Sequence, residues 1–339
     1  MKKTLLAVAI PAVLFAHSIS AAEVYKSDEG FVDFYGQLRT QLEKKEDKDV
    51  TLNAGSSRAG VQAQYSVTDS VDVFGKVEFS LNFTDGEDYE MKNRLHFAGV
   101  DTDFGKITFG RQWIVSDDVG VADYSYFNGG SGNLSGILSG GRHDSYIKYN
   151  YEGEQFWLAA GFGLPEDDTN QELAELYVGS SINGFSFNLG GGVNTDKSAS
   201  AVELENTYYE ATVDYTTGPF LIGFTYYTNE LKDTISGLSI DGDSYTVAAT
   251  YSWADNATAY AGYEYTEQKL SVGSLSEDST VIYVGSDYHF NSYVRVYAEY
   301  AYLDGATLGY TNKESDNTVE PGSRADGDNY FGVGARVYW

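Results

Sequence analysis

The sequence contains 339 residues, with 22 Lys and Arg against 50 Asp and Glu, so the formal net charge is −28. It has 37 Gly, 29 Tyr and four Pro but no Cys, a composition that favours strands and turns over helices. The absence of Cys excludes disulfides, thiolate metal sites and a cysteine nucleophile. The acidic balance argues against nucleic acid as a partner, because phosphate binding requires a basic face.

Residues 1–22 are predicted to be a signal peptide. They begin with Met-Lys-Lys, continue with a mostly apolar stretch over 4–16, and end with the small residues at 20–22 that suit cleavage. The stretch is too short for the ~20 apolar residues of a membrane helix, and no later segment has ~18 consecutive apolar residues. Residues 23–339 are therefore expected to form one domain, either a secreted soluble β-protein or an outer-membrane β-barrel.

Apolar and polar side chains alternate along nearly all of this domain. In the stretch 71–84, for example, Val73 and Val77 fall on one face while Lys76 and Glu78 fall on the other. Such alternation places successive side chains on opposite faces of a sheet. It predicts about sixteen strands, at residues 31–43, 57–68, 71–84, 94–101, 105–113, 144–152, 155–163, 172–181, 185–194, 207–216, 219–229, 243–253, 257–268, 279–290, 292–302 and 328–339.

Alternation alone does not separate a soluble sandwich from a membrane barrel, because both have one apolar and one polar face. Three features favour the barrel. The apolar faces end in aromatic residues, short turns alternate with long connections, and the last strand ends on Trp339. The long connection 303–327 can either cap one end of such a barrel or fold inward.

The connection at 114–143 is unusually long, and its stretch 128–141 has no charged residue. Loops of this length are either surface segments or functional elements. The sequence is therefore compatible with a surface loop or with a loop folded into the barrel.

Short motifs spread over the chain resemble those of the general porins of Gram-negative bacteria. The resemblance is closest to the OmpT-type porins of the vibrio group. The similar stretches are 32–36 (VDFYG), 35–40, 94–99 (RLHFAG), 104–105, 110–111, 116–118, 122–127, 295–300, 307–313 and 334–336.

The resemblance implies an all-β fold, a 16-stranded antiparallel transmembrane β-barrel with an inward-folded constriction loop at about 114–143. It implies a homotrimer in the outer membrane and a C-terminal assembly signal, Trp339, for the barrel-assembly machinery. It also implies a basic wall at the constriction, facing acids on the loop. The basic wall is assigned to Arg58, Arg94 and Arg142, with Arg39 added from its polar-face position, and the loop acids to Asp117, Asp118 and Asp123. The loop tip departs from the family, because no acid follows Phe127 until Asp144. This departure predicts a less charged constriction and leaves open whether Asp117, Asp118 and Asp123 lie opposite the arginines.

Further charged residues fall on polar faces and are candidates for the lumen. They either form a salt-bridge lattice that stabilises the wall, or contribute to a transverse field that disfavours apolar solutes. The candidates are Lys76, Glu78, Lys148, Glu264, Arg295, Glu299 and Arg336.

These features predict a water-filled channel for passive diffusion of small hydrophilic solutes and ions. Acidic clusters in predicted loops, at 43–49, 85–90, 165–168 and 304–328, should concentrate cations at the mouth and give mild cation selectivity. The same acids can instead bind divalent cations that bridge lipopolysaccharide. The expected partners are the lipid bilayer, lipopolysaccharide, diffusing solutes and ions, and two further copies of the chain.

Other outer-membrane barrels act as adhesins, phage receptors or, less often, enzymes. Outside the signal peptide the chain has only His96, His143 and His289. His143 precedes Asp144, but adjacent residues of a strand point to opposite faces. The sequence shows neither a Gly-x-Ser-x-Gly nor a His-Glu-x-x-His motif. No enzyme activity, cofactor or metal site is therefore predicted.

Overall fold

The computed structural model describes residues 22–82, 90–130, 138, 140–167, 171–197, 202–309, 311–312, 319–320, 322 and 324–339. The predicted signal peptide up to residue 21, the acids at 85–89 and the stretch 131–137 lie outside the described residues. Within the described ranges, no helix is long and apolar enough to cross a membrane.

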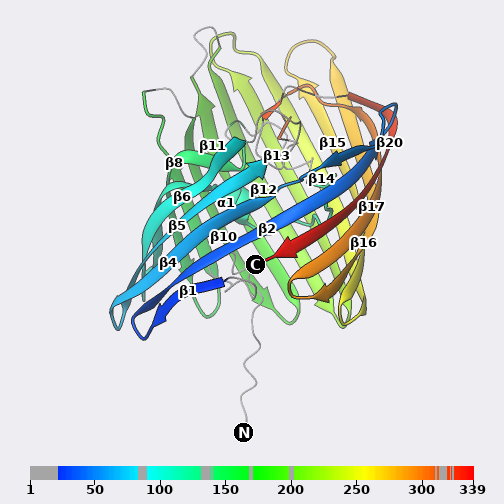
Figure 1. Cartoon of the computed structure of the whole chain (residues 1–339). Helices are drawn as coiled ribbons and strands as arrows, with labels where there is room; N and C mark the ends of the chain where they lie inside the picture. Colours follow the sequence, from blue (N-terminus) through cyan, green and yellow to red (C-terminus); the bar gives the residue numbers. More distant parts are fainter. Residues whose placement is uncertain are drawn as a thin grey trace.

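The chain forms a closed, antiparallel, sixteen-stranded β-barrel, as predicted (Figure 1). Each strand pairs with the next along the chain, and the last strand pairs with the first. The strands are β2 Gly30–Lys45, β4 Arg58–Thr68, β5 Val71–Asn82, β6 Glu90–Thr102, β7 Gly105–Trp113, β8 Arg142–Glu152, β9 Trp157–Gly163, β10 Glu172–Ile182, β11 Phe185–Asp196, β12 Leu204–Thr217, β13 Phe220–Asp233, β14 Ser239–Ala254, β15 Ala257–Leu270, β16 Ser276–Asn291, β17 Val294–Ala306 and β20 Arg324–Tyr338.

Two short strands complete the barrel wall, and neither was predicted. β1 (Ala22–Ser27) and β20 pair with the same edge of β2. β1 pairs with the first half of that edge and β20 with the second half. The join is closed by the Gly36 amide, which donates to the Trp339 carbonyl at 2.9 Å. β3 (Thr51–Asn53) extends β4 along β2 in the same way. Both chain segments thus supply backbone partners where the main strands stop.

The remaining short elements lie in the two longest connections. α1 (Val115–Asp118) follows β7, and the hairpin of β18 (Thr311–Asn312) and β19 (Val319–Glu320) precedes β20. None of these elements was predicted, because each is too short to give a periodic pattern.

The two faces of the wall differ in chemistry, as the alternation predicted. Apolar side chains such as Val61, Phe109 and Leu176 are exposed on the outer face, where lipid would cover them. Polar side chains such as Gln62 and Thr108 are buried on the opposite, inner face. Among the sixteen described barrel strands, closure leaves no unpaired sheet edge to lipid, which is the condition for a sheet to span a bilayer.

Short turns gather at one end of the barrel and long connections at the other (Figure 1). At the long-connection end, the segment before β18 folds inward. It extends away from the neighbouring strands β17 and β20 toward β15. The amides of Leu308 and Gly309 donate to Oε1 of Gln268 at 2.6 and 3.0 Å. Gln268 is a buried residue of β15 that faces the interior.

Trp339 stabilises the join between β1, β20 and β2. Its ring occupies the space where Gly36 lacks a side chain, and its centroid lies 6.1 Å from that of Phe34. We expect Trp339→Ala to lower the free energy of unfolding by roughly 2 kcal/mol, whereas Trp339→Phe retains most of it. The temperature at which folded, SDS-resistant protein converts to the unfolded band measures this loss. Trp253→Ala is the control, because Trp253 is exposed. Equal transition temperatures for Trp339→Ala and wild type would contradict the role.

Candidate functional site

The segment 114–130 crosses the interior of the barrel. It begins after β7, and its Gly120 carbonyl accepts from Nδ2 of Asn188 on β11 at 2.8 Å. Farther along, the Ala122 amide donates to Oγ1 of Thr225 on β13 at 2.8 Å. The ring of Phe127 finally lies 5.6 Å from that of Tyr330 on β20. The segment therefore lies on the polar inner face and spans the barrel from β10 and β11 to β20.

Glu175 of β10 anchors the start of this segment. Its carboxylate accepts the amide of Val115 at 2.7 Å and the hydroxyl of Ser116 at 2.6 Å. It also accepts the phenol of Tyr146 at 2.6 Å and that of Tyr208. Several donors that converge on one carboxylate fix its position. Glu175 therefore holds the start of the segment against the wall.

A glycine on β11 makes this anchor possible. Gly192 pairs with Glu175 on one side and with Tyr208 on the other. A Cβ atom added at Gly192 would contact both the Tyr208 hydroxyl and the Glu175 side chain. Because Gly192 has no side chain, the Tyr208 ring can reach across β11 to the carboxylate.

The far end of the segment is anchored by two further wall carboxylates. Glu299 of β17 accepts the Ser125 hydroxyl at 2.8 Å and the Tyr126 amide at 2.8 Å. Glu264 of β15 accepts the Gly130 amide at 2.6 Å. Glu299 was predicted to line the lumen. It lies on the inner face but is only 1% exposed, because the segment covers it.

Arg58 and Arg94 lie on the inner face and share one counter-ion. Nε of Arg94 lies 2.9 Å from Oε1 of Glu78, and Nε of Arg58 lies 3.6 Å from Oε2. Tyr35 also donates to Glu78 at 3.1 Å, and the Lys76 ammonium lies 4.5 Å from the centre of the Tyr35 ring. The structure thus joins four of the predicted site residues in one group.

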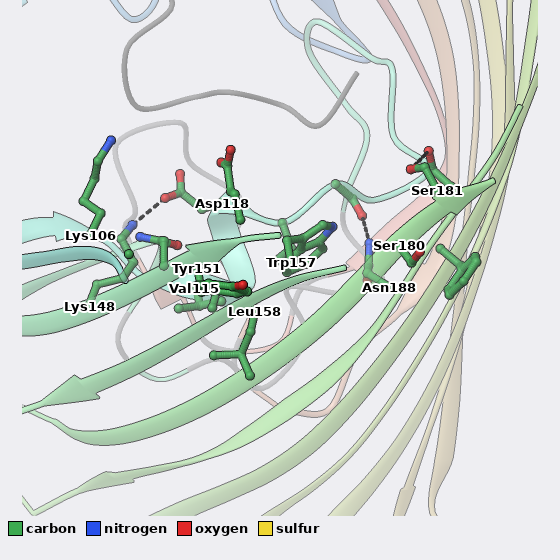
Figure 2. Close-up of a pocket in the computed structure, with 18 of the residues that line it drawn as sticks. Lys106, Val115, Asp118, Lys148, Tyr151, Trp157, Leu158, Ser180, Ser181 and Asn188 are labelled. Atoms are coloured by element: carbon green, nitrogen blue, oxygen red, sulfur yellow. Dashed lines mark hydrogen bonds and ion pairs between the residues drawn. The ribbon is translucent and has the colours of Figure 1, made fainter. Parts of the chain in front are cut away.

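A second group surrounds α1. Lys148 pairs with Asp118 and donates to the Trp113 carbonyl at 2.9 Å. Arg142 is buried, and its guanidinium carbon lies 4.9 Å from the centre of the Trp113 ring. Figure 2 shows Lys148, Asp118 and Trp157 around a cavity of about 400 Å³ between α1 and the wall. This cavity is interior space close to the short-turn end of the barrel.

Arg39, Arg295 and Arg336 come together at the seam of the barrel. Arg336 of β20 pairs in register with Arg39 of β2 and with Arg295 of β17. Arg295 is near Asp287, with Nη1 3.9 Å from the carboxylate, and it donates from Nη1 to the Tyr126 hydroxyl at 2.5 Å.

The three aspartates of the segment have different surroundings. Asp117 is exposed to the interior and Asp118 is paired with Lys148. Asp123 accepts from Ser125 and Tyr283, and burial together with nearby Glu264 raises its pKa to about 8. In the part of the chain that the structure describes, no ion pair joins these aspartates to Arg39, Arg58 or Arg94. The predicted opposition of loop acids and arginines is therefore not a set of direct contacts.

Sequence reasoning missed the anchors Glu175 and Tyr126. A signal for Glu175 was present, because alternation places it on the inner face with the buried Leu173 and Tyr177. An inward carboxylate between two large side chains needs donors, but its partners lie between 29 and 60 residues away in the chain. Among the described residues, no three His, Cys, Asp or Glu side chains form a group that could hold a metal ion.

Known proteins resemble this chain over almost its full length. A family model described as Gram-negative porin matches residues 4–308. Porin-like protein H of Photobacterium profundum is 29% identical, covering 91% of this chain and 98% of its own.

Solved structures extend the comparison to the fold. OmpT of Vibrio cholerae, folded in vitro, is 49% identical with a TM-score of 0.86, covering 94% of this chain and all of its own. A trimer form of that protein is also 49% identical with a TM-score of 0.86, covering 92% of this chain and all of its own. Together with the closed barrel, these matches establish that the chain is an outer-membrane β-barrel protein and belongs to the Gram-negative porin family.

Proposed function

We propose that the protein is a homotrimeric, non-enzymatic channel for passive diffusion of small hydrophilic solutes and ions across the outer membrane. The observation that carries this proposal is the segment 114–130, which lies across the interior of a closed barrel with a polar inner face. Such a segment would narrow the passage through the barrel. The trimer form of the Vibrio cholerae relative supports the homotrimer.

In this proposal the anchored segment and the arginine wall together form the constriction. Glu175, Glu264 and Glu299 fix the segment from β10 to β17, so its position does not depend on direct contacts with Arg58 or Arg94. Glu78 neutralises part of the charge of these two arginines. The wall groups therefore act both as a stabilising lattice and as a source of local field in the lumen.

Mild cation selectivity follows from acids outside the constriction. The sequence carries a net charge of −28, and Glu46, Asp47, Asp167 and Asp304 are exposed at the long-connection end. An excess of negative charge at a channel mouth raises the local cation concentration. The same carboxylates suit divalent cations that bridge lipopolysaccharide, a second role compatible with the first.

Cation selectivity is tested by the zero-current potential of the purified protein in a planar bilayer with a tenfold KCl gradient. We expect a potential of the sign that favours K⁺, and a decrease in its magnitude as total salt rises, because screening shortens the reach of the mouth charges. A potential that favours Cl⁻ would contradict the proposed selectivity while leaving the channel itself in place.

Loss of the Glu175 anchor should loosen the segment. Glu175→Gln removes the charge and replaces one acceptor oxygen by a donor, so we expect larger open-channel current fluctuations and a stability loss of about 1–3 kcal/mol. Glu172→Gln on the same strand is the matched control, because Glu172 is exposed. Currents as steady in Glu175→Gln as in the control would show that Glu175 does not hold the segment.

The protonation state of Asp123 should make the ion selectivity of the channel depend on pH. With a pKa of about 8, Asp123 is mostly neutral below that pH and charged above it. K⁺ over Cl⁻ selectivity should therefore increase as the pH rises from about 6.5 to about 9. Asp123→Asn should reduce the change in this part of the pH profile, and the remaining change is expected from Asp117, whose pKa is raised to about 7. A profile of the same shape in wild type and variant would assign the titration to another group.

A further inference from the structure

We propose that Arg39, Arg336 and Tyr297 form a binding subsite in the lumen for an oxyanion, such as the phosphate or carboxylate group of a passing solute. The inference rests on the proposed channel, because the anion would reach the subsite only through the lumen. The subsite would bind an external anion, whereas Arg58, Arg94 and Arg295 of the same wall lie near carboxylates of the protein itself.

The subsite lies at the seam where the last strands meet the first. Arg39 of β2 and Arg336 of β20 are register partners on the inner face. Tyr297 of β17 pairs with Gly334 of β20, and its ring lies in the space that a side chain at Gly334 would occupy. Because Gly334 is itself paired with β2, the Tyr297 ring lies across β20 in the direction of Arg39.

The two arginines lack the counter-ions that their neighbours have. Arg58 and Arg94 share Glu78, and Arg295 is near Asp287. In the described ranges, no carboxylate lies within ion-pair distance of either Arg39 or Arg336. Like charges on directly opposed residues of neighbouring strands destabilise a sheet. A bound anion between them would turn this repulsion into attraction.

Within the described residues, three buried donor atoms at the subsite have no hydrogen-bond partner. They are Nε of Arg39, Nε of Arg336 and the hydroxyl of Tyr297. Tyr297 is only 2% exposed, so its hydroxyl has little access to bulk water. A buried donor without an acceptor is unfavourable, and charge-assisted bonds to an oxyanion would satisfy it.

The acids close to the subsite already have other partners. Glu43 of β2 accepts from Nδ2 of Asn53 at 2.6 Å, and Glu299 accepts from Ser125 and Tyr126. Asp287 accepts the Tyr126 hydroxyl at 2.7 Å. A side-chain rearrangement that neutralised the arginines would break either the contact of Glu43 with β3 or the contacts of Glu299 and Asp287 with the segment, so an external anion is the simpler counter-ion.

Aromatic rings position the Arg336 guanidinium. Its central carbon lies 4.9 Å from the centre of the Tyr126 ring and 5.1 Å from that of Tyr297. Cation–π contact uses the faces of the guanidinium plane and leaves its edge available for hydrogen bonds. The planar fork is thus preorganised for two oxygens of one phosphate or carboxylate group.

A local anion site is compatible with overall cation selectivity. The acids at the mouth act diffusely on all ions, whereas the subsite acts over hydrogen-bond distances on one group. The subsite is therefore detected as saturable anion binding, and this measurement does not depend on the sign of the zero-current potential.

The test uses the purified full-length protein in planar bilayers, with inorganic phosphate as the probe. Phosphate replaces chloride at constant ionic strength and pH, and the decrease in chloride current is measured as a function of phosphate concentration. We expect a saturable decrease in wild type. The half-saturating concentration should rise about tenfold or more in Arg39→Gln/Arg336→Gln and by a smaller factor in Tyr297→Phe. Acetate in place of phosphate shows whether a carboxylate occupies the same subsite.

Two controls separate binding from a general loss of charge. Arg324→Gln removes one positive charge from an exposed residue of β20 and should keep the wild-type half-saturation. Arg336→Lys keeps the charge but lacks the planar fork. It should therefore show the wild-type current but a higher half-saturating phosphate concentration than wild type. Saturation at the same concentration in wild type and the double variant would overturn the subsite. A conducting wild-type channel with no saturable phosphate effect would also overturn it and leave the proposed channel intact, whereas a protein that does not conduct would remove both.

Discussion

The structure depends on one constraint, the need to pair every backbone amide and carbonyl that faces lipid. In the hydrocarbon core an unpaired peptide group has no water to bind, so a sheet that spans it must close. Closure here requires β20 to pair with β2, and it requires β1 to continue the wall where β20 ends. Two backbone hydrogen bonds between Gly36 and Trp339 join the two segments. The barrel thus uses residues from both ends of the described chain to remove its last free edge.

Closure also determines where polar side chains can go. Alternating residues face either the lipid or the interior, so charged residues of the strands gather on the inner face. The inner carboxylates then have two functions. Glu78 neutralises arginines of the wall, and Glu175, Glu264 and Glu299 accept backbone or hydroxyl donors from the segment 114–130. The position of that segment is therefore a consequence of the strand pattern as much as of its own sequence.

The sequence predicted the barrel because alternation is a local property. Val73 and Val77 opposite Lys76 and Glu78 identify a strand and its two faces without knowledge of any other strand. The pattern says which face a residue occupies but not which residue it meets. It placed Arg39 and Arg336 on polar faces, yet their pairing depends on how strand 328–339 registers with strand 31–43. For the same reason it did not predict that Asp118 pairs with Lys148 or that Gly192 lets Tyr208 reach Glu175. The family resemblance supplied the expectation of an inward segment, but the wall residues that hold it are visible only once the strands are paired.

Size-dependent uptake shows whether the segment 114–130 narrows a water-filled passage through the barrel. Liposomes containing the purified protein would be placed in isotonic solutions of neutral sugars of increasing size, and the rate of swelling would be recorded by light scattering. For a narrowed, water-filled passage we expect fast swelling with the smallest sugars, a steep decrease in rate with increasing size, and no saturation with concentration. The absence of swelling with any sugar, or rates that do not depend on size up to the largest one, would contradict this expectation.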